Sequence, residues 1–189
     1  MSESPKSSLN VFLVGPMGAG KTTIGKRLAE RLGLVFVDSD SEIEERTGAK
    51  IPWIFDIEGE SGFRKREKDV VRDLTARHGI VLATGGGVVL DSDNRVYLTS
   101  RGLVVYLTAP VEQLLERTAR DKNRPLLQTE DPRSRLEAIQ QQRDALYREV
   151  ADIVVDTSVK DIRALVQDLV QAIVQRQSMG TANGRRLSD

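Results

Sequence analysis

Short apolar runs alternate with longer amphipathic stretches along most of this chain. Five of the runs have the length of β-strands, at 9–14, 34–37, 80–84, 103–107 and 153–155. The stretch after the first run carries Ile24, Leu28 and Leu32 four residues apart, as a helix with one apolar face does. Strands that alternate with helices are typical of α/β proteins with a parallel sheet. The pattern therefore predicts an α/β fold around a five-stranded parallel sheet.

Expected helices fill the intervals between these strands, at 21–32, 60–77, 91–100, 111–120, 132–149 and 162–174. Residues 47–61 contain glycine and proline, so we expect short helices there. The run at 34–37 is wholly apolar, which predicts a strand covered on both faces. The polar leader at 1–8 is expected to be flexible and the tail at 175–189 disordered, which leaves one domain at 9–174.

Residues 15–22 read Gly-Pro-Met-Gly-Ala-Gly-Lys-Thr, between the first strand and the first helix. This fits G-x-x-x-x-G-K-[ST], the phosphate-binding loop (P-loop) of nucleotide triphosphatases and kinases. Its glycines let successive N–H groups approach phosphate oxygens. Lys21 would reach the β- and γ-phosphates, and Thr22 would place a hydroxyl on Mg²⁺. The alternative is a chance glycine-rich turn, which the flanking strand and helix disfavour.

Composition narrows the functions that fit. Lys plus Arg and Asp plus Glu each number 28, so no net charge favours nucleic acid or an acidic membrane. With no Cys and one His, thiolate and histidine metal sites are disfavoured. The start has no signal-peptide core, and no apolar stretch approaches the roughly 20 residues of a membrane span. We expect a cytoplasmic enzyme with neither nucleic acid nor membrane as a partner.

Two carboxylates, Asp38 and Asp40, follow the second strand. Ligands of open α/β sheets bind beyond the carboxyl ends of the strands. We therefore expect one carboxylate to serve Mg²⁺ through water and the other to meet an acceptor substrate. No Asp ends the third strand, where an acidic Mg²⁺ partner usually stands, so Asp38 is its natural replacement. Helix capping by Ser39 or Asp40 is the alternative, and both interpretations can hold together.

Three consecutive glycines, Gly85, Gly86 and Gly87, follow the third strand. Their conformational entropy is costly to lose, which indicates that a backbone or a ligand comes too close for any Cβ. A plain flexible turn is the alternative.

Arginines at three places suggest anion binding. Arg64 lies in the first turn of a helix, where the dipole opposes a cation, so a substrate carboxylate or a salt bridge should hold it. Arg143 shares an apolar helix face with Ile139 and needs an anion. The basic stretch 117–124 is either a mobile lid that carries Arg to the phosphates or a solvated loop.

Trp53 and Phe55 are interpreted as packing residues rather than as platforms for a substrate.

Taken in order, these pieces resemble the shikimate kinase family, which has the nucleoside monophosphate kinase-like P-loop fold. The resemblance spans about residues 9–174 and rests on GPMGAGKTT, Asp38-Ser39-Asp40, Phe63-Arg64 with Glu67, the triple glycine, Arg124-Pro125-Leu126, and Arg143 before Leu146-Tyr147. It implies a three-layer α/β/α P-loop kinase. A substrate-binding helical segment would lie at about 39–66 and a lid at about 118–132.

The resemblance also implies a reaction. The γ-phosphoryl group of ATP would pass to the 3-hydroxyl of shikimate, a step of the shikimate pathway to chorismate and aromatic amino acids. Mg²⁺ would be the cofactor, ATP and shikimate the partners, and the protein a monomer.

Roles for individual residues follow from the same resemblance. ATP would be bound by Gly18, Ala19, Gly20, Lys21, Thr22, Thr23, Arg117, Arg124 and Lys160. Shikimate would be bound by Asp40, Arg64, Gly86, Gly87 and Arg143, with both arginines on its carboxylate. Lys21, Asp40 and Arg124 would be catalytic, and Thr22 and Asp38 would serve Mg²⁺. Relatives often have Arg near the adenine where this chain offers Lys160, and an ammonium stacks less well than a guanidinium.

Two other functions stay open at this point. A kinase of gluconate or of a nucleoside monophosphate would share the architecture, because function resides in the acceptor site. A catalytically silent nucleotide-binding module is the second, although the intact Lys21, Thr22 and Asp38 disfavour it.

Overall fold

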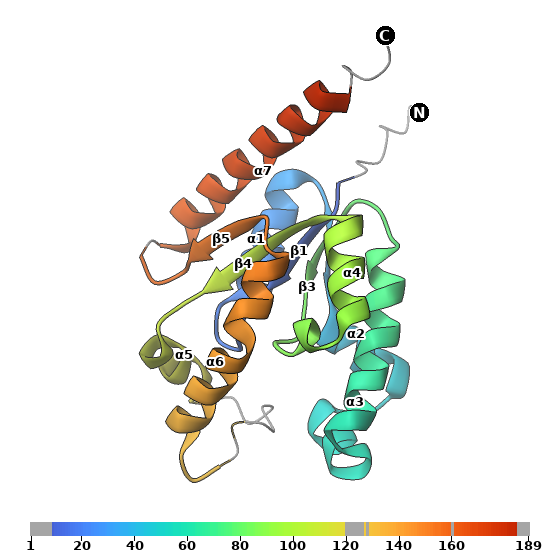
Figure 1. Ribbon diagram of the computed structural model, residues 1–189, viewed down its shortest axis with the longest axis vertical. Coiled ribbons are helices and arrows are strands. Elements are labelled where there is room, and N and C mark those ends of the chain that lie inside the picture. The colour runs from blue at the N-terminus through green and yellow to red at the C-terminus, as the bar shows by residue number, and fades with distance from the viewer. Residues whose placement is uncertain (1–8, 120–126, 128, 160, 185–189) are drawn as a thin grey trace.

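Strand β1 (Val11–Val14) lies in the middle of the sheet, and all four of its residues are buried. The computed structural model describes residues 9–119, 127, 129–159 and 161–184 (Figure 1). Within these residues the sheet has five parallel strands in the order β2-β3-β1-β4-β5. The other strands are β2 (Val35–Asp38), β3 (Ile80–Ala83), β4 (Leu103–Thr108) and β5 (Ile153–Asp156). The predicted α/β fold with a five-stranded parallel sheet is confirmed.

Helices cover both faces of the sheet, which gives three layers (Figure 1). Because side chains alternate along a strand, Val11 and Leu13 enter one core and Phe12 and Val14 enter the other. The first core is covered by α1 (Lys21–Leu32) and α7 (Ile162–Gly184), the second mainly by α3 (Ile51–Thr75), α4 (Ser92–Arg101) and α6 (Pro132–Val150). Three short elements follow the carboxyl ends of strands: α2 (Ser39–Thr47), the 3₁₀-helix η1 (Val88–Leu90) and α5 (Val111–Thr118). In the described part of the chain, no helix combines the length and apolar character needed to cross a bilayer.

Helix α3 is broken at Gly59, whose φ of 67° and ψ of −178° are not helical. Glycine tolerates this backbone conformation because it has no Cβ. The two halves correspond to the short helix and the long helix expected on either side of residue 60.

Strand β2 differs from its prediction. It lies at the edge of the sheet and pairs with β3 alone, and Val35 is 65 % exposed. The expectation of a strand covered on both faces is therefore wrong, because an apolar run at an edge has the same sequence pattern as one in the interior.

Helix α7 continues to Gly184, past the expected end at residue 174. The expectation of disorder is therefore wrong for 175–184, while 185–189 and the leader 1–8 lie outside the described residues. Gln and Arg are good helix formers, so the polar composition at 175–177 does not stop the helix. Arg176 also lies 3.6 Å from the carboxylate of Asp152, which holds this turn near the sheet.

A single polar residue joins the starts of three strands. Asn10, 3 % exposed, donates from Nδ2 to the carbonyls of Arg77 (2.6 Å) and Arg101 (3.1 Å). Its Oδ1 accepts from the amide of Ile80 at 3.3 Å. The buried amide therefore satisfies backbone groups that lead into β3 and β4 from a position just before β1.

We predict that Asn10→Leu lowers the free energy of unfolding by about 1–3 kcal/mol, because buried backbone groups lose their partners. Urea denaturation followed by circular dichroism measures the change. Gln142→Leu, at an exposed position on α6, is the control and should stay within about 0.5 kcal/mol of the parent chain. An Asn10→Leu protein as stable as the parent would show that water replaces these hydrogen bonds.

Candidate active site

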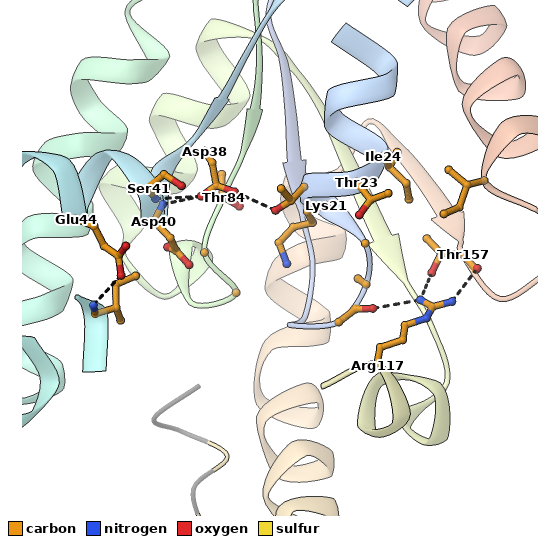
Figure 2. A pocket seen from close by; sticks show the side chains of 18 of the residues that line it. Lys21, Thr23, Ile24, Asp38, Asp40, Ser41, Glu44, Thr84, Arg117 and Thr157 are labelled. Carbon is orange, nitrogen blue, oxygen red and sulfur yellow. Dashed lines mark hydrogen bonds between the residues drawn. The ribbon is translucent and has the colours of Figure 1, made fainter. Parts of the chain in front are cut away.

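A cavity of about 660 Å³ opens at the carboxyl ends of β1, β2 and β3, where α/β sheets bind their ligands (Figure 2). One part of its lining comes from the P-loop with α1, the end of β2 with α2, and the start of α3. The glycines after β3 and residues of α5 and α7 supply the rest. The predicted residues on the lining are Gly18, Ala19, Gly20, Lys21, Thr22, Thr23, Asp38, Asp40, Gly86 and Arg117. One cavity thus joins the predicted nucleotide residues to part of the predicted acceptor residues.

The P-loop is folded tightly against the sheet. Gly15 has a φ of 141°, and a Cβ at this position would collide with the carbonyl oxygen of Leu107 on β4. The Lys21 ammonium donates to the carbonyls of Gly15 (2.7 Å) and Pro16 (2.8 Å). The loop therefore places a cation beside the first turn of α1, where unpaired N–H groups favour anions.

Asp38 connects the P-loop to the second strand. Its Oδ2 accepts from the Thr22 hydroxyl at 3.0 Å, and its Oδ1 accepts from the amides of Asp40 (3.0 Å) and Ser41 (3.2 Å). The second pair of bonds caps α2, so the capping residue is Asp38, and the alternative that named Ser39 or Asp40 is wrong. Ser39 instead accepts at Oγ from the amide of Gly85 at 3.1 Å.

Two carboxylates face each other across Gly85. A methyl group on this residue would lie 2.7 Å from Oε1 of Glu67 and 2.9 Å from Oδ1 of Asp40. The Glu67 side chain is 1 % exposed, and burial raises the pKa of its carboxyl; Arg64 opposes the shift and Asp40 adds to it. The close approach predicted for the triple glycine is therefore found at Gly85, but side chains approach it there rather than the backbone or ligand that was expected.

Arg64 forms salt bridges with two carboxylates on its own helix. Its Nη1 lies 2.7 Å from Glu67, and its Nη2 lies 2.9 Å from Glu60. Burial lowers the pKa of Arg64, but Glu67 and Glu60 outweigh burial and raise it above its usual value. The guanidinium also lies where a Cβ on Gly87 would be. The salt-bridge interpretation of Arg64 is therefore confirmed, and a substrate carboxylate remains a proposal.

Arg143, on α6, is 3 % exposed. Among the residues that the structure describes, no carboxylate lies within salt-bridge distance of its guanidinium, and its Nε has no hydrogen-bond partner. Burial lowers the pKa of Arg143; the Tyr147 hydroxyl opposes the shift, and Arg64 adds to it. A buried cation with so few internal partners is what an anion site requires.

Arg117 reaches across the nucleotide side of the cavity from α5 (Figure 2). Its Nη1 donates to the carbonyl of Gly18 (3.2 Å) and to the hydroxyl of Thr157 (3.1 Å), and its Nη2 donates to the side chain of Gln113 (3.0 Å). Thr157, which follows β5 and lines the cavity, was not predicted. Its place just after a strand could have indicated it, because the other strand ends also carry site residues.

Some predictions meet other outcomes. Arg124, Lys160 and the lid residues 120–126 and 128 lie outside the described residues. Phe55 packs on Phe63 with ring centroids 4.8 Å apart, so the packing prediction is confirmed for Phe55. It is wrong for Trp53, which is 60 % exposed. Glu67 pairs with Arg64 and faces Asp40 across Gly85, although no site role was predicted for it; its spacing of three residues from Arg64 was the available signal.

The fold and this cavity define a P-loop kinase whose acceptor is a small molecule. The sequence matches the profile of the shikimate kinase family over residues 17–174. The chain therefore belongs to the shikimate kinase family, whose members phosphorylate shikimate at the expense of ATP in the pathway to aromatic amino acids.

Individual relatives agree with this membership. The chain is 56 % identical to the shikimate kinase of Aliivibrio fischeri over 88 % of its own length and 97 % of the relative's. It is 58 % identical to that of Methylococcus capsulatus, over 86 % of this chain and 91 % of the relative. The solved structure of shikimate kinase from Acinetobacter baumannii in complex with shikimate superposes with a TM-score of 0.88 at 54 % identity, covering 90 % of this chain and 96 % of that one.

The crowding at Gly85 gives a prediction. Gly85→Ala should lower kcat/KM for shikimate on the order of 100-fold. The added methyl group would be too close to the carboxylates of Glu67 and Asp40, so both would have to move out of position. Steady-state kinetics measures this, and the KM for ATP on the same protein is the internal control and should be unchanged. A fully active Gly85→Ala enzyme would show that the carboxylates move aside without consequence.

Proposed function

We propose that this cavity transfers the γ-phosphoryl group of ATP, held on the P-loop, to the 3-hydroxyl of shikimate, held between Asp40 and the arginines. The observation that carries the proposal is Arg143, a buried cation near the acceptor side for which the described residues supply no carboxylate. Membership of the shikimate kinase family and the shikimate-bound relative from Acinetobacter baumannii support the same acceptor.

On the nucleotide side, backbone N–H groups of Gly18, Ala19 and Gly20 with Thr23 would bind the phosphates. Lys21 would exchange the carbonyls of the loop for phosphate oxygens. Arg117 is proposed to stack on the adenine, and Thr157 would fix the position of its guanidinium. Contacts from Arg124 to the phosphates and from Lys160 to the adenine remain predictions.

Mg²⁺ fits the donors at the start of α1. The Thr22 hydroxyl and the Asp38 carboxylate lie 3.0 Å apart, and both are the hard oxygen ligands that Mg²⁺ prefers. Among the described residues, no cluster of three or more His, Cys, Asp or Glu could hold a metal alone. That agrees with Mg²⁺, which binds through one or two protein oxygens together with substrate phosphates and neutralises their charge.

On the acceptor side, Arg143 and Arg64 would bind the carboxylate of shikimate. Gly86 and Gly87 would present their backbone to the ring, and Asp40 would bind its hydroxyls. Phosphoryl transfer has a loose transition state, so positioning and charge stabilisation contribute most and a strong base is not required. We therefore propose that the main role of Asp40 is to orient the 3-hydroxyl and that proton acceptance is its secondary role, while Lys21 and Arg124 stabilise the phosphoryl charge.

The segment at about 39–66 is proposed to close over shikimate and the segment at about 118–132 over ATP, which would exclude water from the γ-phosphate. Gly59, within the first segment, supplies a break in α3 at which such a movement could occur. A cytoplasmic monomer remains our prediction. Trp53 and Ile57, one turn apart on α3, are among its exposed large hydrophobic residues.

Arg143→Ala should raise the KM for shikimate on the order of 100-fold, because charge-assisted hydrogen bonds to the carboxylate are lost. An acceptor that carries a hydroxymethyl group in place of the carboxylate should be insensitive to the change. Arg148→Ala, five residues along α6 and exposed, is the matched control and should retain the parent KM. Equal losses with both acceptors would contradict the pairing of Arg143 with a carboxylate.

Asp40→Asn should lower kcat on the order of 100-fold while ATP binding stays nearly intact, because the amide neither accepts the proton nor orients the hydroxyl equally well. Glu44→Gln is the control, since this carboxylate also lines the cavity but is bound to Lys50. Turnover is followed through coupled ADP detection with a panel of acceptors: shikimate, gluconate and nucleoside monophosphates. An unchanged kcat would remove Asp40 from the mechanism, and turnover of another acceptor alone would overturn the proposed function.

A further inference from the structure

Tyr147 is a fully buried residue of α6 that no part of the proposed mechanism uses. It lies one helical turn after Arg143, so the two side chains occupy the same face of the helix. Burial raises the pKa of the Tyr147 hydroxyl, which therefore stays protonated and can donate a hydrogen bond. A buried phenol generally needs such a partner.

The partner is the second glycine of the triple-glycine loop. The Tyr147 hydroxyl donates to the carbonyl of Gly86. Gly86 also abuts the P-loop: a Cβ on this residue would lie 3.5 Å from the amide of Met17, 3.6 Å from the carbonyl of Gly15 and 3.8 Å from the Tyr147 hydroxyl. Tyr147 thus contacts the glycine loop at the point where it passes between the nucleotide and acceptor sides.

Arg143 is the buried neighbour of Tyr147 one turn earlier on α6, and each group shifts the pKa of the other. Arg143 has no carboxylate partner among the described residues. The phenol oxygen is therefore a polar neighbour of the guanidinium. One hydroxyl consequently lies between two of the proposed shikimate-binding residues, Arg143 and Gly86.

The ring of Tyr147 is itself fixed by packing. It stacks on Tyr106 of β4 with centroids 4.9 Å apart and planes 27° apart. The Tyr106 hydroxyl donates to Asp144 at 2.8 Å, and Asp144 also accepts from Arg148 at 2.7 Å. The two tyrosines are therefore matched: each is buried, stacked and bound through one hydroxyl. Only the hydroxyl of Tyr147 contacts the acceptor residues.

We propose that Tyr147 is a positioning residue for the acceptor site. Its hydroxyl fixes the Arg143 guanidinium relative to the Gly86 carbonyl, so that shikimate can contact both groups together. The inference rests on the proposed function. Tyr147 touches no reacting atom, so its loss weakens acceptor binding without altering the nucleotide side.

Tyr147→Phe removes the hydroxyl and keeps the stacked ring. The KM for shikimate should rise about 5- to 20-fold, because Arg143 and Gly86 each lose one buried polar partner. The kcat should change less than about twofold. The KM for ATP should not change. Tyr106→Phe removes the equivalent hydroxyl, which binds Asp144. Tyr106→Phe should lower the melting temperature by as much as Tyr147→Phe does. It should leave the KM values for shikimate and for ATP at the parent level.

Partial unfolding of a variant does not obscure this comparison, because it reduces the concentration of active enzyme and so the apparent kcat, but not KM. In the Arg143→Ala background, adding Tyr147→Phe should cost less in kcat/KM than it does in the parent, because the two residues act together. An unchanged shikimate KM in Tyr147→Phe, equal KM changes in both tyrosine variants, or full additivity with Arg143→Ala would each overturn the proposal. Absence of shikimate turnover by the parent chain would instead overturn the proposed function.

Discussion

The central position of β1 in a parallel sheet is the constraint on which the site depends. Parallel strands direct all their carboxyl ends to one edge, so the P-loop, Asp38 and the triple glycine emerge side by side. The contact of Gly15 with the Leu107 carbonyl presses the P-loop against β4, and the bond from Thr22 to Asp38 joins it to β2. The loops are therefore positioned by the register of buried strands rather than by contacts with one another alone.

Burial of charge shapes the acceptor side. Arg64 has two carboxylate partners on its own helix, whereas Arg143 has none in the described part of the chain. Both cations lie near Glu67, and burial raises the pKa of that carboxyl. An isolated buried charge is costly, so this asymmetry favours an incoming anion at Arg143 over one at Arg64. The proposed shikimate carboxylate would meet that need.

Features that depend on short stretches of sequence could be predicted. The P-loop directly follows β1 and Asp38 ends β2, so their positions are set by the strand pattern and by local turn chemistry. Features that depend on packing between distant segments could not. The bond from Tyr147 to Gly86 joins residues 61 positions apart, and the exposure of Trp53 depends on which elements cover α3. The edge position of β2 likewise depends on strand order, which apolar runs alone do not specify.

The two hydrogen bonds of Lys21 to the carbonyls of Gly15 and Pro16 have a thermodynamic consequence. An ammonium has three donors, and two of them are already satisfied by the protein. A phosphate oxygen that takes one of these two donors substitutes for an existing acceptor, and the heat released is the difference between two kinds of hydrogen bond rather than the full strength of a new one. The same carbonyls keep the loop folded around its cation, so little ordering entropy is left to lose when a nucleotide arrives.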